Sequence, residues 1–417
     1  MGLEPSFQIH LKLPDIRILS VTNTDRGELV ISIESTHATT RCRHCGREIR
    51  DFHCLGEPIR LRHLPVFDQP VFLEIRPKRY RCNRCEGHPT STQRCDWYSE
   101  RSPNTRAWDQ MALRILINST VTDTGRKLGV SEETIDGVLT RHIATEVDWD
   151  EYKKLGRIGI DEIALKKGHR DYVAIITAPL VGGGVAILAV LEDRKKETVK
   201  AFLETIPDRL RLSIERVNTD MHEGYVRAVE ELLPWVKIVV DRFHVAKAYG
   251  ECADQARKQE LRRLKKQLTK AQFEPLKGVM WPFRKDPEDL EPEERKLLDR
   301  VLERSPALKQ VYDLREKLTA IFDRPLSKSG AQCALRAWIK QVRASGLTYF
   351  DSFLTTLDNW MDEITNYFLD RETSGFVEGF NNKVKVLKRR CYGIFNVGRI
   401  FQQLYLDLEG YRLFGFG

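Results

Sequence analysis

Residues 157–161 read Arg-Ile-Gly-Ile-Asp, and residues 214–220 read Ile-Glu-Arg-Val-Asn-Thr-Asp. Both stretches are rich in β-branched residues, which favours strands, and each ends on a single aspartate, Asp161 or Asp220. Three further strand-like runs accompany them, and two helical patterns separate the last three strands. We expect strands at 157–165, 172–178, 185–191, 214–219 and 236–240, and helices at 195–206 and 222–232.

This order of elements, three strands followed by helix, strand, helix and strand, predicts a ribonuclease-H-like mixed α/β core. In such a core the first and fourth strands are neighbours, so Asp161 and Asp220 should end those strands side by side. The glycines at 182–184 fit a hairpin turn between the second and third strands. They lack the Lys-Ser or Lys-Thr that follows in a phosphate-binding loop.

A third carboxylate, Glu378, opens a basic amphipathic helix far downstream. Two sets of residues, each spaced at i, i+4, i+7 and i+11, define two faces of this helix. The apolar face consists of Phe380, Val384, Leu387 and Cys391, and the polar face of Glu378, Asn382, Lys385 and Arg389. We expect the apolar face to be buried, Glu378 to reach the two aspartates, and the remaining polar residues to follow a phosphate backbone.

Three carboxylates beside basic side chains suit a site for Mg²⁺, or Mn²⁺, that acts on nucleic-acid phosphates. We expect Asp161, Asp220 and Glu378 to hold two ions for in-line attack by water or a DNA 3′-hydroxyl. Each acid also has a structural alternative. Asp161 can cap a turn, Asp220 can cap the next helix, and Glu378 can be a surface acid.

The segment Asp241-Arg-Phe-His244 follows the last strand of the core, near the same edge. Polar groups at the carboxyl ends of such strands often belong to a site. Asp241 is therefore a candidate to support the acids, and His244 a candidate to orient a phosphate. A helix cap and a satisfied histidine explain the same residues.

Nine cysteines are present, and six of them lie within the first 95 residues. Cys42, Cys45, Cys82 and Cys85 form two Cys-x-x-Cys pairs, which predict a four-thiolate structural zinc site in a reducing compartment. Free buried cysteines are the alternative. Spare candidate ligands for a second metal or a ligand exchange are His44, His53, Cys54, His88 and Cys95.

The zinc pairs and the alternating strands around them predict a small zinc ribbon in residues 1–101. Residues 102–150 read as helix, short helix, Gly-containing turn and helix, with Ser131 capping the third helix. This layout predicts a DNA-binding helix-turn-helix, and a three-helix linker bundle would look similar. Residues 151–250 and 371–417 form the catalytic core, and residues 251–370 an all-helical insertion.

Composition narrows the class of protein. The chain has 417 residues, a net charge of +8, 41% hydrophobic and 31% charged residues, which predicts a soluble multidomain protein. No apolar run approaches the ~20 residues needed to span a bilayer, and no secretory signal is apparent, so we expect a cytoplasmic protein. Clustered basic residues favour a polyanionic partner such as DNA, although ordinary solvated surface is the alternative.

Together these motifs resemble the DDE transposases of bacterial insertion sequences, most closely the ISL-three (ISL3) family. The specific motifs are Asp241-Arg-Phe-His-Val and Glu378-Gly-Phe-Asn-Asn-Lys-Val-Lys, and the zinc and helix-turn-helix patterns are generic. One departure is the first finger, Cys-Arg-His-Cys, where a proline often follows the first cysteine. The resemblance implies Asp161, Asp220 and Glu378 as the acidic triad.

The resemblance further implies double-stranded DNA as partner, both as terminal inverted repeats and as target, and a nucleoid-associated enzyme. A homodimer on paired ends follows from the chemistry of joining two ends. The sequence therefore predicts a transposase that cleaves and transfers DNA strands. The alternatives are a DNA-binding regulator with an inactive nuclease-like core and a different two-metal nuclease.

Overall fold

The computed structural model describes residues 11, 13–164, 172–180, 183–371, 375–391 and 396–415, without the side chains of residues 375–378 and 381. The chain divides into two units. One comprises Met1–Ala144 with Leu406–Gly417, and the other comprises Thr145–Tyr405. They are described separately below.

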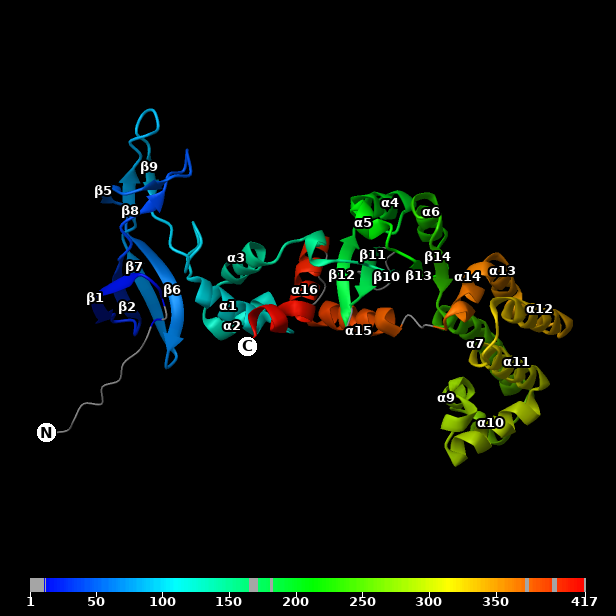
Figure 1. The fold of residues 1–417 in the computed structure, drawn as a ribbon. Coiled ribbons are helices and arrows are strands. Elements are labelled where there is room, and N and C mark those ends of the chain that lie inside the picture. Colours follow the sequence, from blue (N-terminus) through cyan, green and yellow to red (C-terminus); the bar gives the residue numbers. More distant parts are fainter. Residues whose placement is uncertain are drawn as a thin grey trace. The chain divides into compact units, whose positions relative to one another are not determined.

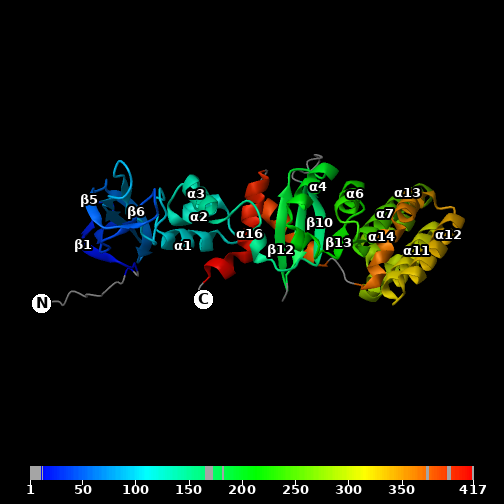
Figure 2. The ribbon, with the colours of Figure 1, turned by 45° about the horizontal axis from the view of Figure 1, so that its top comes forward.

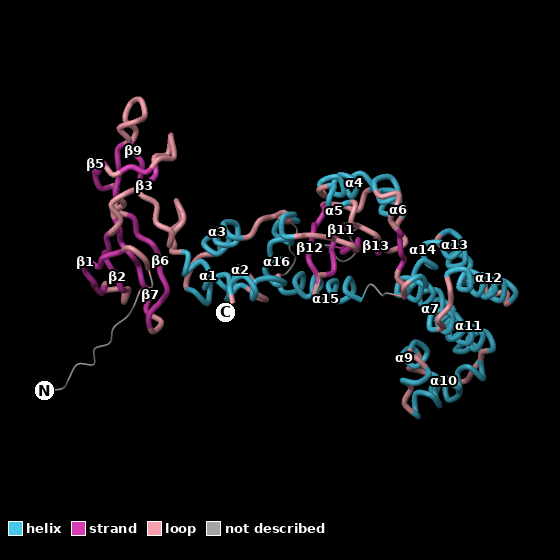
Figure 3. The backbone as a smooth tube through the Cα atoms, in the orientation of Figure 1, coloured by secondary structure: helices cyan, strands magenta, loops and turns pink. Residues whose placement is uncertain are grey.

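The first unit combines small β-sheets with helices (Figures 1 and 3). Its strands are β1 (Ile16–Asn23), β2 (Leu29–Ser35), β3 (Thr40–Arg41), β4 (Glu48–Ile49), β5 (Asp51–Leu55), β6 (Ile59–Val66), β7 (Gln69–Ile75), β8 (Lys78–Arg81) and β9 (Thr90–Thr92). A four-stranded sheet has the order β1-β2-β7-β6, and the smaller sheets are β3-β4 and β5-β8-β9. The alternation predicted in β7 is confirmed, because Val71, Leu73 and Ile75 are all buried.

The three helices predicted after residue 102 are present as α1 (Arg106–Leu116), α2 (Val121–Leu128) and α3 (Glu132–His142). Ser131 caps α3 as predicted, accepting the backbone N–H of Thr134. Gly129 ends α2 in the left-handed conformation, with φ of 64°, which glycine adopts without strain. The carboxylate of Asp109 on α1 accepts hydrogen bonds from Arg141 and His142 at the end of α3, which ties these two helices together.

The second unit contains the predicted five-stranded sheet, in the order β12-β11-β10-β13-β14. Its strands are β10 (Arg157–Ala164), β11 (Tyr172–Pro179), β12 (Val185–Leu191), β13 (Arg216–Thr219) and β14 (Lys237–Val240). β11 is antiparallel to both of its neighbours, β10 and β12, whereas β10, β13 and β14 are parallel. Each predicted strand therefore exists, and the first and fourth are neighbours.

Helices lie on both faces of this sheet (Figure 1). On one side are α4 (Lys196–Thr205), α5 (Asp208–Arg211) and α6 (Glu223–Leu232), and on the other is α15 (Gly375–Arg390). A 3₁₀ turn, η1 (Trp149–Glu151), precedes β10, and the last helix is α16 (Val397–Phe414). The core between the sheet and α4 to α6 is apolar, with Ile158, Val199, Leu203 and Val229 fully buried.

The predicted all-helical region adjoins β14 (Figure 2). Its helices are α7 (Arg242–Gln267), α8 (Lys270–Phe273), α9 (Met280–Arg284), α10 (Pro292–Arg304), α11 (Pro306–Asp323), α12 (Lys328–Ala344), α13 (Asp351–Asn359) and α14 (Met361–Thr365), with 3₁₀ turns η2 (Glu274–Leu276), η3 (Pro287–Asp289), η4 (Thr348–Phe350) and η5 (Asn366–Leu369). The side-chain amide of Asn366 donates to the Ile238 carbonyl of β14 at 2.8 Å. The boundary drawn between residues 250 and 251 falls inside the continuous helix α7.

Candidate active site

Asp161 and Asp220 lie at the same level on two neighbouring parallel strands. The register pairs Ile160 of β10 with Thr219 of β13, and each aspartate is the next residue along its chain. Neighbouring strands are ~4.8 Å apart, so the two carboxylates start from adjacent backbone positions. The prediction that these residues come together at one edge of the parallel pairing is confirmed.

The expectation that Asp161 ends its strand is wrong, whereas the expected bounds 157–165 agree with β10. β10 continues to Ala164, because it remains paired with β11 after its pairing with β13 has stopped. Asp161 thus stands where one neighbouring strand ends while the other continues. Its carboxylate accepts the backbone N–H of Glu162 at 2.6 Å.

The pKa of Asp220 is strongly raised. Burial raises its pKa to about 7, and the negative charges of Asp161 and Glu162 add to the effect. Arg194 and Lys247 act in the opposite direction. Its Oδ1 atom is buried and has no hydrogen-bond partner among the described residues. A buried carboxylate next to a second carboxylate is stabilised in its charged form by a cation.

Polar side chains close to Asp220 in the chain share this lack of partners. Within the described residues, no hydrogen bond satisfies the buried Oγ1 of Thr219, Nδ1 of His222 or hydroxyl of Tyr225. The centroids of the His222 and Tyr225 rings are 4.5 Å apart. Burial raises the pKa of Tyr225, and the negative charge of Asp220 adds to this effect. The loop from β13 to α6 is therefore lined with polar atoms directly beside the acid pair.

Helix α15 packs its apolar face on the sheet, as predicted. Phe380, Val384 and Leu387 are buried, and Cys391 just beyond the helix is half-buried. The ammonium group of Lys388 donates to the Ala164 carbonyl at the end of β10. The helix is therefore anchored on the strand that carries Asp161.

The polar face of α15 points to solvent at Asn382, Lys385 and Arg389, which are all exposed. Glu378 lies in the first turn of α15, and its side chain is outside the described part of the chain. The contact of Glu378 with the two aspartates thus stays a prediction.

Asp241 continues the row of aspartates, because Val240 of β14 pairs with Thr219 of β13. Its side chain caps α7 by accepting the backbone N–H of Phe243 at 2.9 Å, which is the structural alternative considered above. His244 is half-buried, with its ring centroid 5.7 Å from that of Phe243.

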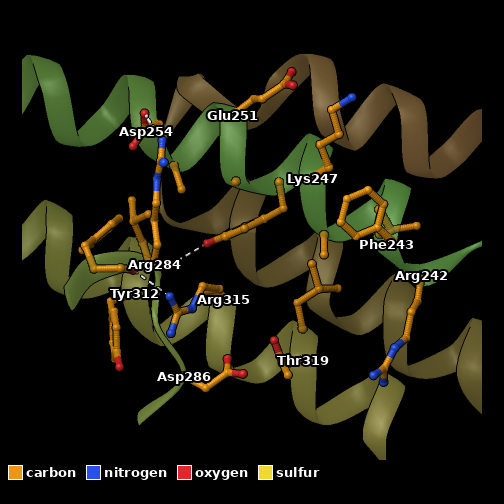
Figure 4. Close-up of a pocket in the computed structure, with 18 of the residues that line it drawn as sticks. Arg242, Phe243, Lys247, Glu251, Asp254, Arg284, Asp286, Tyr312, Arg315 and Thr319 are labelled. Carbon is orange, nitrogen blue, oxygen red and sulfur yellow. Dashed lines mark hydrogen bonds and ion pairs between the residues drawn. The ribbon is translucent and has the colours of Figure 1, made fainter. Parts of the chain in front are cut away.

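Asp241 also lines a groove of about 1090 Å³, together with residues of α7 and α11. Figure 4 shows several of these residues. Phe243 and Lys247 line this groove, and Arg284 and Arg315 lie deeper in it. The two arginines are bound to neighbouring groups, Arg284 to Asp254 and Arg315 to the carbonyls of α9 and its end.

The four cysteines of the first unit are brought together. Cys42 and Cys45 lie between β3 and β4, and Cys82 and Cys85 lie between β8 and β9. Their sulfur atoms all lie within 4.8 Å of one another. Backbone N–H groups of Cys45 and His44 lower the pKa of the Cys42 thiol to about 6. The arrangement suits a tetrahedral thiolate site such as zinc occupies.

The spare ligands are not part of this cluster. Among the described residues, these cysteines form the one group of three or more acids, histidines or thiols whose ligand atoms lie close enough together to hold a metal ion. His53 instead contacts the Arg81 guanidinium at 2.8 Å. Glycines 46 and 87 have positive φ at the turn of each finger, and this tight turn forms although Arg43 follows the first cysteine.

Comparison with known proteins decides the family. A family model described as a transposase, of the DDE type and the ISL3 group, matches residues 158–404. The chain belongs to the ISL3 family of transposases. It is 29% identical over 371 residues to the transposase for insertion sequence element IS1001 of Bordetella parapertussis, covering 88% of each chain. It is 24% identical over 396 residues to the transposase for IS1557 of Mycobacterium tuberculosis, covering 89% of this chain and 86% of that one.

The transposase has two further charged residues at its acid pair that the sequence did not single out. Glu162 follows Asp161 directly, and its carboxylate accepts a hydrogen bond from Arg194 at 2.7 Å. A signal was present, since Arg194 comes shortly after the third strand, but sequence spacing alone does not place it near Asp220.

Membrane-spanning helices are absent from the described part of the transposase.

Proposed function

We propose that this transposase cleaves the ends of its insertion sequence and joins them to target DNA, using Asp161, Asp220 and Glu378. The observation that carries the proposal is the placement of Asp161 and Asp220 at one level of two parallel strands. The strand order β12-β11-β10-β13-β14 with antiparallel β11 supports a ribonuclease-H-like core. Family membership supports DNA cleavage and transfer as the reaction.

The residues at this edge fit a divalent cation. Hard carboxylate oxygens are the ligands that Mg²⁺ and Mn²⁺ prefer, and the buried Oδ1 of Asp220 is available to one. Asp161 and Asp220 would hold the metal, with Glu378 from α15 as the third acid. When bound, two such ions activate a water or 3′-hydroxyl and stabilise the leaving oxygen. The chain itself holds the acids in register and keeps Asp220 out of bulk water.

The basic face of α15 would bind the DNA backbone beside the acids. Lys385 and Arg389 are exposed on the helix whose apolar face is fixed to the sheet. A rigid basic helix next to an acidic centre offsets the repulsion between the carboxylates and the phosphates. Asp241 would support the site by capping α7. His244 remains a candidate to contact a phosphate.

The first unit would recognise the element ends. We propose that Cys42, Cys45, Cys82 and Cys85 bind structural zinc, and that α1 to α3 bind double-stranded DNA as a helix-turn-helix. Two ends have to be brought together for joining, so we expect a homodimer on paired ends. In this scheme the first unit provides sequence specificity and the second provides chemistry.

An end-cleavage assay tests the proposal. Purified protein is incubated with labelled DNA carrying the gene's flanking inverted repeats, in Mg²⁺, Mn²⁺ or EDTA. Metal-dependent nicking at the ends, lost in Glu378→Gln and Asp220→Asn but retained in the exposed surface variant Glu197→Gln, supports the triad. Specific end binding without cleavage in any metal would instead favour the regulator alternative. Cleavage away from the ends would favour a different nuclease.

A further inference from the structure

Arg194 lies in the loop between β12 and α4, close to the acid pair but outside the proposed triad. Its Nη1 atom donates to the Glu162 carboxylate at 2.7 Å, and its guanidinium carbon lies 4.4 Å from the centroid of the Tyr172 ring. These two residues belong to β10 and β11, so the side chain is held against the strand of Asp161 and its neighbour. An arginine held by a carboxylate and an aromatic face has one preferred orientation.

The backbone of the same residue packs on the helix that follows Asp220. A Cβ atom on Gly224, in the first turn of α6, would lie 3.4 Å from the Arg194 carbonyl oxygen and 3.0 Å from the His222 ring. The glycine allows this close approach. Its contacts with Glu162 and Tyr172, and the position of its carbonyl oxygen against α6, thus hold Arg194 beside the segments that carry both aspartates.

Arg194 is also close enough to influence the acid pair. Glu162, which it binds, directly follows Asp161, and Gly224, which lies against its carbonyl oxygen, comes shortly after Asp220 in the chain. The side chain remains 39% exposed, although Glu162 and Tyr172 hold it. A guanidinium has five N–H donors in a planar fork, and the Glu162 bond uses one of them. The others have no hydrogen-bond partner among the described residues.

We propose that Arg194 binds a phosphate of the DNA strand that is cut at Asp161 and Asp220. The inference rests on the proposed function of that acid pair. Glu162 alone would add a third negative charge where DNA has to approach, and Arg194 neutralises it. The remaining N–H groups of Arg194 match the oxygens of a phosphate, which arginine binds in a bidentate manner. Arg194 is therefore a DNA-positioning residue.

The test is a double-mutant cycle between the protein and single phosphates. End DNA is prepared with one phosphate at a time replaced by an uncharged methylphosphonate around the cleavage site. Affinity is measured by fluorescence anisotropy in Ca²⁺, and cleavage in Mg²⁺, for the wild type and for Arg194→Gln. Lys195→Gln is the matched control, because Lys195 is adjacent, 74% exposed and paired with Asp193.

At one phosphate, the methylphosphonate should weaken binding about tenfold in the wild type and in Lys195→Gln, and less than twofold in Arg194→Gln. Arg194→Lys, which keeps the charge but not the fork, should keep part of this sensitivity and guards against a misfolded glutamine variant. Equal sensitivity of wild type and Arg194→Gln at every phosphate would overturn the inference. A wild type that neither binds nor cuts the ends would overturn the proposed function as well, which separates the two failures.

Discussion

Asp161 and Asp220 directly follow the paired residues Ile160 and Thr219, so they lie at the same level where the parallel pairing of β10 and β13 ends. Asp161 remains half-buried within β10, whereas burial and the charge of Asp161 raise the pKa of Asp220 to about 7. The carboxylates of Asp161 and Asp220 therefore repel each other when both are charged, and a divalent cation would relieve this repulsion. This relationship leads to the first prediction.

Asp220→Asn should make the metal-free protein more stable. Because the pKa of Asp220 is higher in the folded than in the unfolded state, its ionisation opposes folding above the unfolded-state value, and the full cost applies above about pH 7. Removing the charge should raise the free energy of unfolding at pH 8 in EDTA by at most about 4 kcal/mol. The gain should shrink steadily between pH 7 and pH 4. Thermal unfolding across this pH range is the measurement, and a variant less stable at pH 8 would contradict it.

Cys82→Ser should remove zinc from the first unit. Cys82 is fully buried among the four thiols, and three remaining ligands bind zinc much less tightly than a closed four-thiolate site. We expect about one zinc per chain in the wild type and a large loss in the variant, measured by metal analysis. The control is Cys54→Ser, since Cys54 lies on β5 outside the cluster and should keep its zinc. Equal zinc in both variants would rule out the four-cysteine site.

Asp109→Asn should destabilise the three-helix region. The carboxylate is 2% exposed and accepts hydrogen bonds from Asn104, Arg141 and His142. Removing the Asp109 charge leaves its hydrogen-bond partners without a countercharge, which should lower the free energy of unfolding by about 3 kcal/mol. Chemical unfolding of the first unit measures the loss, with the exposed Asp123→Asn as the control that should change stability by less than about 0.5 kcal/mol.

The same network predicts a pH dependence with a definite sign. His142, Asn104 and Arg141 together hold the pKa of Asp109 below its ordinary value, although burial opposes them. A carboxyl with a lowered pKa stabilises the folded state above its unfolded-state pKa and loses this contribution as the pH falls through the folded value. The wild-type advantage over Asp109→Asn should therefore disappear at acid pH, below about pH 4. An advantage that grows on acidification would contradict the assignment.

Gly125→Ala should distort the turn between α2 and α3. A Cβ atom at this position would lie 2.8 Å from the Val130 carbonyl oxygen, which is backbone and cannot move aside cheaply. We expect a loss of about 1 to 3 kcal/mol, together with weaker binding of end DNA. Gly250→Ala is the control, because Gly250 is exposed within α7 with open space around it. There alanine should stabilise the helix by about 0.5 to 1 kcal/mol.

The order of elements, the cysteine pairs and the two aspartates could be predicted from local patterns in the chain. Local patterns are sufficient for these features: alternation and β-branching predict strands, and x-x spacing brings two thiolates to one turn. The buried face of α15 was predictable as well, since Phe380, Val384 and Leu387 share one side of any helix.

Tertiary structure alone decided which charged groups meet at the sheet edge. Pairing with β11 keeps Asp161 inside a strand after the pairing with β13 has ended, and the start of α7 at Arg242 selects the capping alternative for Asp241. Arg194 reaches Glu162 and Tyr172 only because β12 returns beside β11 and directs the following loop to the edge of β10 and β13. The sequence separates these residues by 22 to 32 positions, and only strand pairing over such distances brings their charges within interaction range.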